Sequence, residues 1–360
     1  MRLGDAIRRH AADGWSDQAG RGAPGRRRDE TGAVQTFLPY ADFDRSAAVL
    51  DSPRLGKQRV ETLQVLRALE LPEYGWVNHP VVRMWRGFTP ALVAYGLACV
   101  AEWRRRGHAD STEPMIDEFA PGADRRTLER IGQLPPWLGD DRLHLSHRAA
   151  LVRKDPAFYR PVLGDVDEPA EYWWPGGPDA APRPPEGSPL WVVRPPATAA
   201  HDALLLEGLV GLGPESGIDV DASGLGAEAL RDLLATRAPG RRPGKDLRQL
   251  HTLLHEVGPG HAIGLLHPER GDLTVGLVEG DYAYASPGDA DEGAAPDALP
   301  HHRRAVRWTG RLPRSAVRRP ATLQDPRRLF RVDVDPARLR RALAPAHEPQ
   351  ARAQAMSSPT

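Results

Sequence analysis

Residues 49–69, VLDSPRLGKQRVETLQVLRAL, decide how the first half of this 360-residue chain folds. After Pro53 the apolar residues of this stretch recur at helical spacing, and the pattern ends before Pro72. These apolar residues are Val60, Leu63, Leu66 and Leu69. The stretch therefore predicts one long helix that has an apolar face and a charged face.

The rest of the chain predicts a change of fold class after its middle. Helical patterns continue over residues 91–106 and 142–154, and a Pro/Gly-rich linker follows. Beyond the linker we expect helices at 226–237 and 246–257. Short apolar runs there predict strands at 191–194, 208–211, 261–266, 273–278, 305–308 and 329–334. We therefore expect an α-helical N-terminal domain and an α+β C-terminal domain, the latter a small β-barrel with inserted helices.

Changes in composition divide the chain into segments. They are an extension at 1–33, the helical domain at 34–175, the linker at 176–188, the α+β domain at 189–335 and a tail at 336–360. The extension and most of the tail are expected to be disordered, because they lack apolar periodicity. Valine can be encoded by GTG, which bacteria also use as a start codon. A chain that begins at Val34 is therefore as good an interpretation as one that begins at Met1.

Composition excludes several classes of protein. The 48 basic and 48 acidic residues balance, so the chain lacks the global positive field of a nonspecific DNA coat. A single cysteine, Cys99, excludes an internal disulfide and a four-thiolate zinc site. We find neither an apolar run of about 18 residues, which a membrane span needs, nor a signal peptide. The sequence predicts a soluble, cytoplasmic protein without a metal or cofactor.

Two candidate catalytic residues lie on the charged face of the long helix. Glu61 follows Lys57 by four residues, so the two side chains can pair on one surface. Arg54 and Arg59 of the same helix are candidates for binding phosphates. A carboxylate near an amine on an arginine surface suits proton transfer at a sugar carbon of DNA. An ordinary charged helix face explains the same residues equally well.

Two further clusters are candidates for DNA binding. In NHPVVRMWRG, residues 78–87, Arg83 and Arg86 could bind phosphates, and Trp85 could stack on a base. Ordinary packing with exposed arginines is the alternative. In HLSHR, residues 144–148, the last two residues are His147 and Arg148. Its two histidines lie three residues apart, but no carboxylate or thiol lies at a suitable spacing, so we expect no metal there.

Residues 35–175 resemble the pyrimidine-dimer DNA glycosylases of the phage endonuclease V type, and specifically their bacterial branch. The resemblance is carried by QTFLPYADF, VLDSPRLGKQRVETLQVLRAL, GWVNHPVVRMWRG, LPPWLGDDRLHLSHRAALVRKDPAFYRPVL and YWWP. It implies a helical DNA glycosylase and AP lyase in which Glu61 is the catalytic carboxylate. His147-Arg148-Ala149-Ala150 resembles a His-Glu-Ala stretch of the phage enzyme.

The chain departs from that family in its nucleophile. The resemblance implies attack on the sugar carbon C1′ by the α-amine of a first-position threonine. From Met1 that amine lies some 35 residues from the site, and a chain begun at Val34 would read Met-Gln-Thr, with Thr36 in third place. Lys57 is the nearest side-chain amine. The nucleophile is therefore a terminal amine, Lys57, or absent.

The second half of the chain resembles the PUA/EVE-like modules of restriction-type proteins. WVVRP, HAIGLL, GDLTVGLVEGDYAY and RAVRW, followed by PRS, occur in the order found in those modules. The resemblance implies a pocket that binds flipped or modified bases, or RNA. Arginines gather in the same region, with no acidic residue between His301 and Pro320. They are Arg303, Arg304, Arg307, Arg311, Arg314, Arg318 and Arg319, of which Arg304, Arg307 and Arg314 are our candidates for phosphate contacts.

These observations together predict a DNA repair-type glycosylase and AP lyase with an appended base-reading module. Its expected partner is double-stranded DNA with damaged or modified bases, so the protein would be associated with the nucleoid. A non-catalytic reader of modified DNA or RNA is one alternative. A defence or restriction enzyme that excises modified bases is the other.

Overall fold

The computed structural model describes residues 35–71, 74, 77–164, 166, 172–175, 187–213, 218–237, 245–286 and 299–344. The expected N-terminal extension lies outside the described residues, as do almost all of the expected linker and most of the expected tail.

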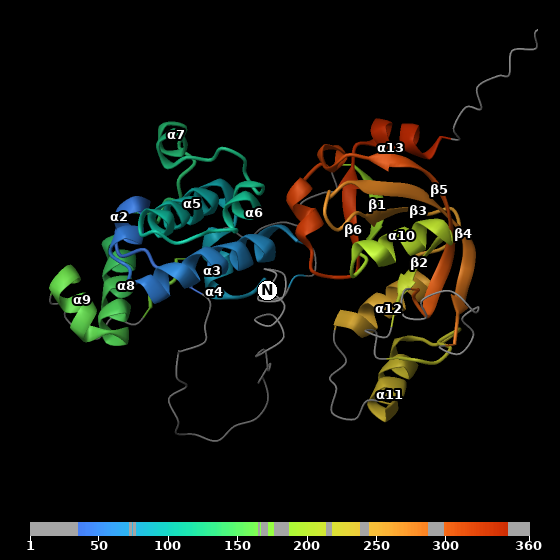
Figure 1. The fold of residues 1–360 in the computed structure, drawn as a ribbon. Coiled ribbons are helices and arrows are strands. Elements are labelled where there is room, and N and C mark those ends of the chain that lie inside the picture. Colours follow the sequence, from blue (N-terminus) through green and yellow to red (C-terminus); the bar gives the residue numbers. More distant parts are fainter. Residues whose placement is uncertain are drawn as a thin grey trace, which may run out of the picture. The chain divides into compact units, whose positions relative to one another are not determined.

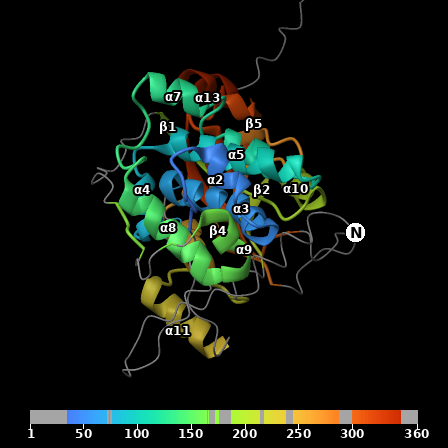
Figure 2. The ribbon, with the colours of Figure 1, turned by 90° about the vertical axis from the view of Figure 1, so that its left-hand side faces the viewer.

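The first part of the described chain is built from helices (Figure 1). They are α2 (Phe43–Ala48), α3 (Ser52–Glu70), α4 (Pro80–Trp85), α5 (Thr89–Arg105), α6 (Glu113–Asp117), α7 (Arg125–Arg130), α8 (Asp141–Lys154) and α9 (Pro156–Leu163). Helix α5 packs against α2 and α3, and α8 lies beside α9, as Figure 2 also shows. The three long helices predicted from periodicity are therefore confirmed as α3, α5 and α8.

Local signals explain where α3 lies and how it packs. Its N-cap is Asp51, whose Oδ1 accepts a hydrogen bond from the backbone of Arg54 at 2.7 Å. Pro53 occupies the first turn, where a missing N–H costs nothing. The contact with α5 is close at Gly96, because a Cβ there would come within 2.6 Å of Cγ2 of Thr62. Helix α3 is therefore fixed by its cap at one end and by α5 along its side.

The second part of the chain is a six-stranded mixed sheet with helices (Figure 1). Its strands are β1 (Ser188–Val193), β2 (Leu209–Leu212), β3 (Ala262–Leu266), β4 (Leu273–Tyr284), β5 (His302–Leu312) and β6 (Leu329–Val334). Its helices are α10 (Thr198–Leu206), α11 (Ala227–Arg237), α12 (Lys245–His255) and α13 (Pro336–Leu343), with 3-10 turns η2 (Arg314–Ala316) and η3 (Pro320–Gln324). All six predicted strands are confirmed, and so are the two predicted helices, as α11 and α12.

The strand order is β2-β5-β4-β3-β1-β6. Strand β1 runs parallel to β3, and the other neighbouring strands pair antiparallel. The outermost strands β2 and β6 do not pair with each other in the described residues, so the sheet is open there. The mixed α+β class is confirmed, whereas the closed barrel that we expected is not.

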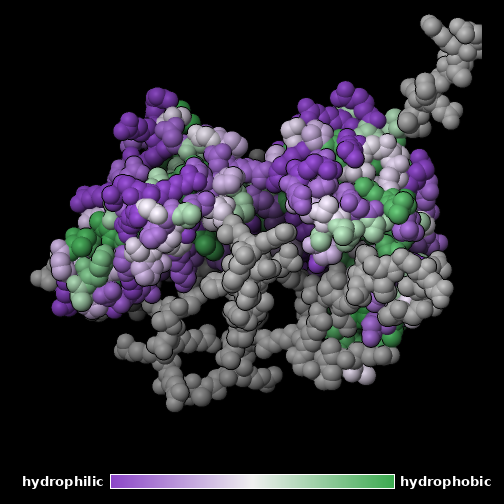
Figure 3. All heavy atoms as spheres, viewed as in Figure 1, coloured by the Kyte–Doolittle hydropathy of each residue, from purple (hydrophilic) through white to green (hydrophobic). Residues whose placement is uncertain are grey.

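Each face of the sheet carries its own hydrophobic core. Because side chains alternate along a strand, Val193 of β1 packs with α11 and α12 while Val192 packs with residues of β6 and α13. On the face drawn in Figure 3, hydrophilic residues cover most of the described surface, with small hydrophobic patches between them. Among the described residues, no helix has both the length and the apolar character that crossing a membrane requires.

Candidate functional site

Glu61 is a nearly buried carboxylate in the middle of α3, with only 3% of its surface exposed. Its Oε1 lies 3.1 Å from Nζ of Lys57, and its Oε2 accepts a hydrogen bond from Nε2 of Gln58 at 2.7 Å. Burial raises the pKa of Glu61, against the opposing influence of Lys57, the backbone N–H of Gln35 and Gln58. The predicted pairing of Lys57 with Glu61 is thus confirmed.

Lys57 differs from Glu61 in its exposure to solvent. Its side chain is 56% exposed, compared with 4% for the side chain of Glu61. The pair therefore joins an amine that a large molecule can reach to a carboxylate that is largely withdrawn from water. Such an arrangement can hold a negative charge close to a positive charge that forms during a reaction.

An extended segment, residues 35–38, lies against Glu61 and is itself buried. Gln58 holds this segment with both ends of its amide: Nε2 donates to the carbonyl of Gln35 at 2.9 Å, and Oε1 accepts from the backbone of Phe37 at 2.9 Å. The hydroxyl of Tyr95 also donates to Oε1 of Gln58, at 2.7 Å. All hydrogen-bonding capacity of this buried amide is therefore used.

Two histidines of α8 hold the other end of the same segment. The backbone of Leu38 donates to Nδ1 of His147 at 2.8 Å, and the carbonyl of Leu38 lies 2.8 Å from Nδ1 of His144. The backbone of Gly139 donates to Nε2 of His144 at 3.0 Å, so His144 carries its proton on Nδ1. The described part of the chain holds no group of three or more residues suited to a metal ion.

His147 was a candidate for DNA binding, and its position corrects that expectation. The ring is fully buried, and burial lowers the pKa of His147 to about 3. A neutral, buried ring that accepts a hydrogen bond from Leu38 cannot bind a phosphate at the surface. Its role is to fix the segment that lies against Glu61.

Trp85 also lies in the core and not at the surface. It is fully buried, its Nε1 donates to Oγ1 of Thr36 at 3.0 Å, and its ring meets that of Trp137 edge to face at 4.9 Å. Stacking on a DNA base would require this ring to leave the core. The structure therefore assigns Trp85 to the support of residues 35–38, which corrects the expected stacking role.

Arg54 and Arg59 of α3 both form ion pairs within the protein, but their side chains differ in exposure to solvent. Arg59 forms an ion pair with Asp110 and lies over the ring of Trp103, with 12% of its side chain exposed. Arg54 pairs with Asp51, the N-cap of its own helix, and keeps 22% of its side chain exposed. Arg59 is thus placed to hold α3 in position, and Arg54 is the more accessible of the two.

The remaining candidates of the helical part lie outside α3. Arg83 of α4 is exposed. Nη2 of Arg86 donates to the carbonyl of Val77 at 2.6 Å. Nη1 of Arg148 donates to the carbonyl of Pro39 at 3.4 Å. Arg83 is therefore the candidate of this group that is best placed for a phosphate.

The arginines after His301 are not unopposed, which corrects the interpretation of that stretch. Arg304 is buried, and it donates from Nε to the carbonyl of Leu253 and from Nη2 to that of Leu254, both at 2.9 Å. Arg307 pairs with Glu279, Arg314 with Glu118, and Arg318 with Asp335. The acidic partners come from other parts of the chain. The lack of acidic residues between His301 and Pro320 therefore did not mean that these arginines form an unpaired basic surface.

Sequence reasoning missed the residues that surround Glu61. Gln35, Gln58 and Tyr95 hold the segment and the carboxylate together, yet none was a candidate. One signal was available for Gln58, which lies three residues before Glu61 and hence on the same side of the helix. No signal in the sequence placed residues 35–38 beside α3, because that contact is long-range.

Comparison with known proteins agrees with the first resemblance over part of its range. Residues 34–115 match the family described as pyrimidine dimer DNA glycosylase. The match includes residues 35–38, Lys57, Glu61 and helices α2 to α5, and it ends before α8. No curated protein and no solved structure matches the chain. The PUA/EVE-like resemblance of the second half remains a prediction.

Proposed function

We propose that the protein is a DNA repair-type glycosylase and AP lyase that acts on pyrimidine dimers, with Glu61 as its catalytic carboxylate. The observation that carries this proposal is the buried Glu61 carboxylate with an exposed amine 3.1 Å away. The pair lies inside the region that matches the pyrimidine dimer DNA glycosylase family. We further propose that residues 34–175 form the catalytic domain, and that residues 189–335 form an appended base-reading module.

The proposed chemistry needs a neutral amine beside a negative charge. The amine lone pair attacks C1′ of the damaged nucleotide, and the electron pair of the C1′–N bond leaves with the base. Opening of the sugar ring then gives a protonated Schiff base. Removal of a C2′ proton expels the 3′ phosphate, and water finally hydrolyses the Schiff base. Glu61 stabilises the cationic sugar through its charge and carries protons during these steps.

Two amines can serve this carboxylate. The first is Nζ of Lys57, which is exposed and already in contact with Glu61. The second would be the α-amine of a chain that begins at residue 34, because the neighbouring backbone N–H of Gln35 bonds to the Glu61 carboxylate. An α-amine has a pKa near 8, so a sizeable fraction is neutral at pH 7.

The DNA would lie across the exposed side of α3 and α4. Lys57, Arg54 and Arg83 are cations there with exposed or partly exposed side chains, and they would contact phosphates. Extrusion of a damaged nucleotide costs less than that of an intact one, which favours lesions over normal base pairs.

Borohydride trapping tests the proposal directly. Duplexes that contain a thymine photodimer or an abasic site are incubated with the full chain and with a version that begins at residue 34. Each is compared with its Glu61→Gln and Lys57→Ala variants, and Glu129→Gln, an exposed glutamate of α7, is the matched control. We expect a covalent adduct that Glu61→Gln lowers at least 100-fold and Glu129→Gln leaves unchanged.

The same experiment identifies the amine and separates the alternatives. Loss of the adduct in Lys57→Ala assigns Lys57, whereas an adduct formed only by the shorter version assigns the terminal amine. One observation favours a non-catalytic reader: Nζ of Lys57 is already engaged by the Glu61 carboxylate, at 3.1 Å. DNA binding without any adduct would support that reader. Adducts on modified but not on irradiated DNA would indicate a defence enzyme.

A further inference from the structure

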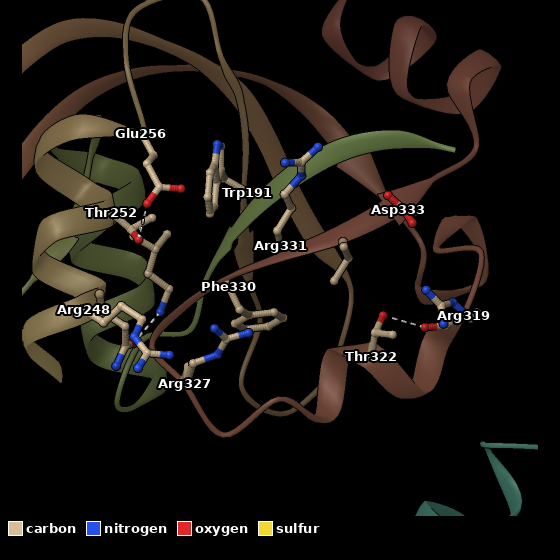
Figure 4. Close-up of a pocket in the computed structure, with 13 residues that line it drawn as sticks. Trp191, Arg248, Thr252, Glu256, Arg319, Thr322, Arg327, Phe330, Arg331 and Asp333 are labelled. Atoms are coloured by element: carbon tan, nitrogen blue, oxygen red, sulfur yellow. Dashed lines mark hydrogen bonds between the residues drawn. The ribbon is translucent and has the colours of Figure 1, made fainter. Parts of the chain in front are cut away.

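A cavity of about 330 Å³ lies in the sheet part of the protein, between α12 and the edge strand β6. Six of its lining residues carry the inference: Trp191, Arg248, Thr252, Glu256, Arg327 and Arg331. In Figure 4 the indole of Trp191 stands between Thr252 of α12 and Glu256, which directly follows that helix, on one side and Arg331 of β6 on the other. The volume lies at the lower end of the range for small-molecule pockets.

The cavity follows the open edge of β6. Its lining includes Leu329 and Phe330, which pack into the cores on opposite faces of the sheet, so the cavity reaches around the strand. Oε1 of Gln249 accepts from the backbone of Leu329 at 2.9 Å, and the backbone of Arg318 donates to the carbonyl of Asp333 at 2.9 Å. The outward backbone groups at both ends of this edge are therefore already hydrogen-bonded within the protein.

Between those two ends, the backbone N–H and C=O of Arg331 face away from the neighbouring strand. The backbone N–H of Leu329 and the carbonyl of Asp333, each two residues from Arg331, both form their bonds on the side away from β1. Because hydrogen-bonded and non-hydrogen-bonded pairs alternate along an antiparallel ladder, Arg331 and its partner Trp191 also form a non-hydrogen-bonded pair. The N–H and C=O of Arg331 consequently point away from β1, toward the cavity.

The side chains of the cavity combine cations, an aromatic face and acceptors. The guanidinium of Arg331 lies 5.9 Å from the centre of the Trp191 ring, and in the described residues it has no carboxylate within ion-pair distance. Arg327 pairs with Asp325. On the opposite wall the hydroxyl of Thr252 donates to Oε1 of Glu256 at 3.0 Å. A ligand here meets positive charge on one side and a carboxylate on the other.

We propose that this cavity binds a single nucleotide, an assignment that rests on the proposed nucleic-acid function of the protein. The base stacks on Trp191, its polar edge bonds to the backbone of Arg331 and to Glu256, and its phosphate binds the guanidinium group of Arg331. A purely anionic ligand would be repelled by Glu256. A nucleotide has hydrogen-bond donors on its base for that carboxylate and an anionic phosphate for Arg331.

Calorimetric titration of the full chain tests this assignment. The probes are the four deoxynucleoside monophosphates, a single-stranded tetranucleotide and a duplex. The variants are Arg331→Gln and Trp191→Leu, and Arg340→Gln, an exposed arginine of α13 outside the cavity, is the matched control. We expect wild type to bind at least one monophosphate, both cavity variants to weaken binding about tenfold or more, and the control to change it less than twofold.

The probes separate the sources of the nucleotide. Tighter binding of the tetranucleotide than of any monophosphate assigns the cavity to an exposed base of a nucleic acid, and equal binding assigns it to a free nucleotide. Absence of binding to every probe would overturn the proposal, and so would equal losses in the control. An acidic peptide that binds at Arg331 where no nucleotide binds would replace it with strand addition at the edge of β6.

The adduct assay and the nucleotide-binding assay report on two separate sites, the Glu61 site and the cavity beside Trp191. Arg331→Gln is expected to keep the borohydride-trapped adduct of wild type, because the substitution lies outside the Glu61 site. Glu61→Gln is expected to keep nucleotide binding in the cavity. An adduct that disappears in Arg331→Gln would contradict the separation of the two sites.

Discussion

Glu61 makes a measurable contribution to stability because it is buried. Its raised pKa in the folded chain means that below pH 4.5 the carboxyl is protonated in both states, and at higher pH the folded state holds its proton longer. The contribution of Glu61 to stability is therefore complete below pH 4.5 and is lost as the pH rises through the raised pKa. Burial of the charge is the physical cause.

Glu61→Gln is therefore expected to lose activity without a matching loss of stability. The free energy of unfolding of wild type relative to Glu61→Gln should fall as the pH rises from 4.5 toward 7, measured by urea denaturation. Glu129→Gln, which changes an exposed carboxylate, should show no such trend. A wild-type advantage that grows with pH would show that the ionised Glu61 is favoured by its surroundings.

His147 gives the opposite dependence on pH. The unfolded histidine is protonated below about pH 6.5, while the folded ring, with a pKa of about 3, remains neutral. Its contribution to stability is complete above pH 6.5 and is lost as the pH falls. From pH 6.5 to 5 wild type should lose about 2 kcal/mol relative to His147→Asn, which keeps an acceptor for Leu38. The exposed His108, changed to Asn, is the control, and equal slopes for both variants would contradict the burial argument.

At the scale of elements, the packing of residues 35–38 against α3 depends on the hydrogen bonds of Gln58. Gln58→Ala leaves the carbonyl of Gln35 and the N–H of Phe37 without their partner in a buried place. We expect a loss of about 2–4 kcal/mol in unfolding free energy, and reduced adduct formation at temperatures where the variant is folded. Gln64→Ala, on the same helix but half-buried, should cost less than about 1 kcal/mol. Equal costs would mean that the segment is held by other contacts.

The helices that the sequence predicted are those long enough for their apolar residues to repeat over several turns. Helices α3, α5 and α8 span several turns, so their apolar spacing was visible, whereas α4, α6 and α7 have only five or six residues each. Strand β4 was expected to end at residue 278 but continues to Tyr284, past a register shift between Val278 and Tyr282. The irregular pairing there breaks the alternation on which the prediction depended.

At the scale of the whole molecule, sequence patterns predicted the class of the fold but not the closure of its sheet. Closure depends on the tilt and pairing of distant strands, and no short motif encodes whether β2 meets β6. The same limit applied to charge. Arg307 has no acidic neighbour along the chain, but it has Glu279 across the sheet. Conversely, the Lys57–Glu61 pair was predictable because the helix alone sets its geometry.

The central claim is that Glu61 and a neighbouring amine form a Schiff-base site. Peptide mapping of the borohydride-trapped adduct by mass spectrometry tests it most directly, with wild type beside Glu61→Gln. We predict a sugar remnant on Lys57, or on the terminal amine of the version begun at residue 34, and its near absence in Glu61→Gln. A protein that binds photodimer and abasic DNA yet carries no remnant on any amine would contradict the claim.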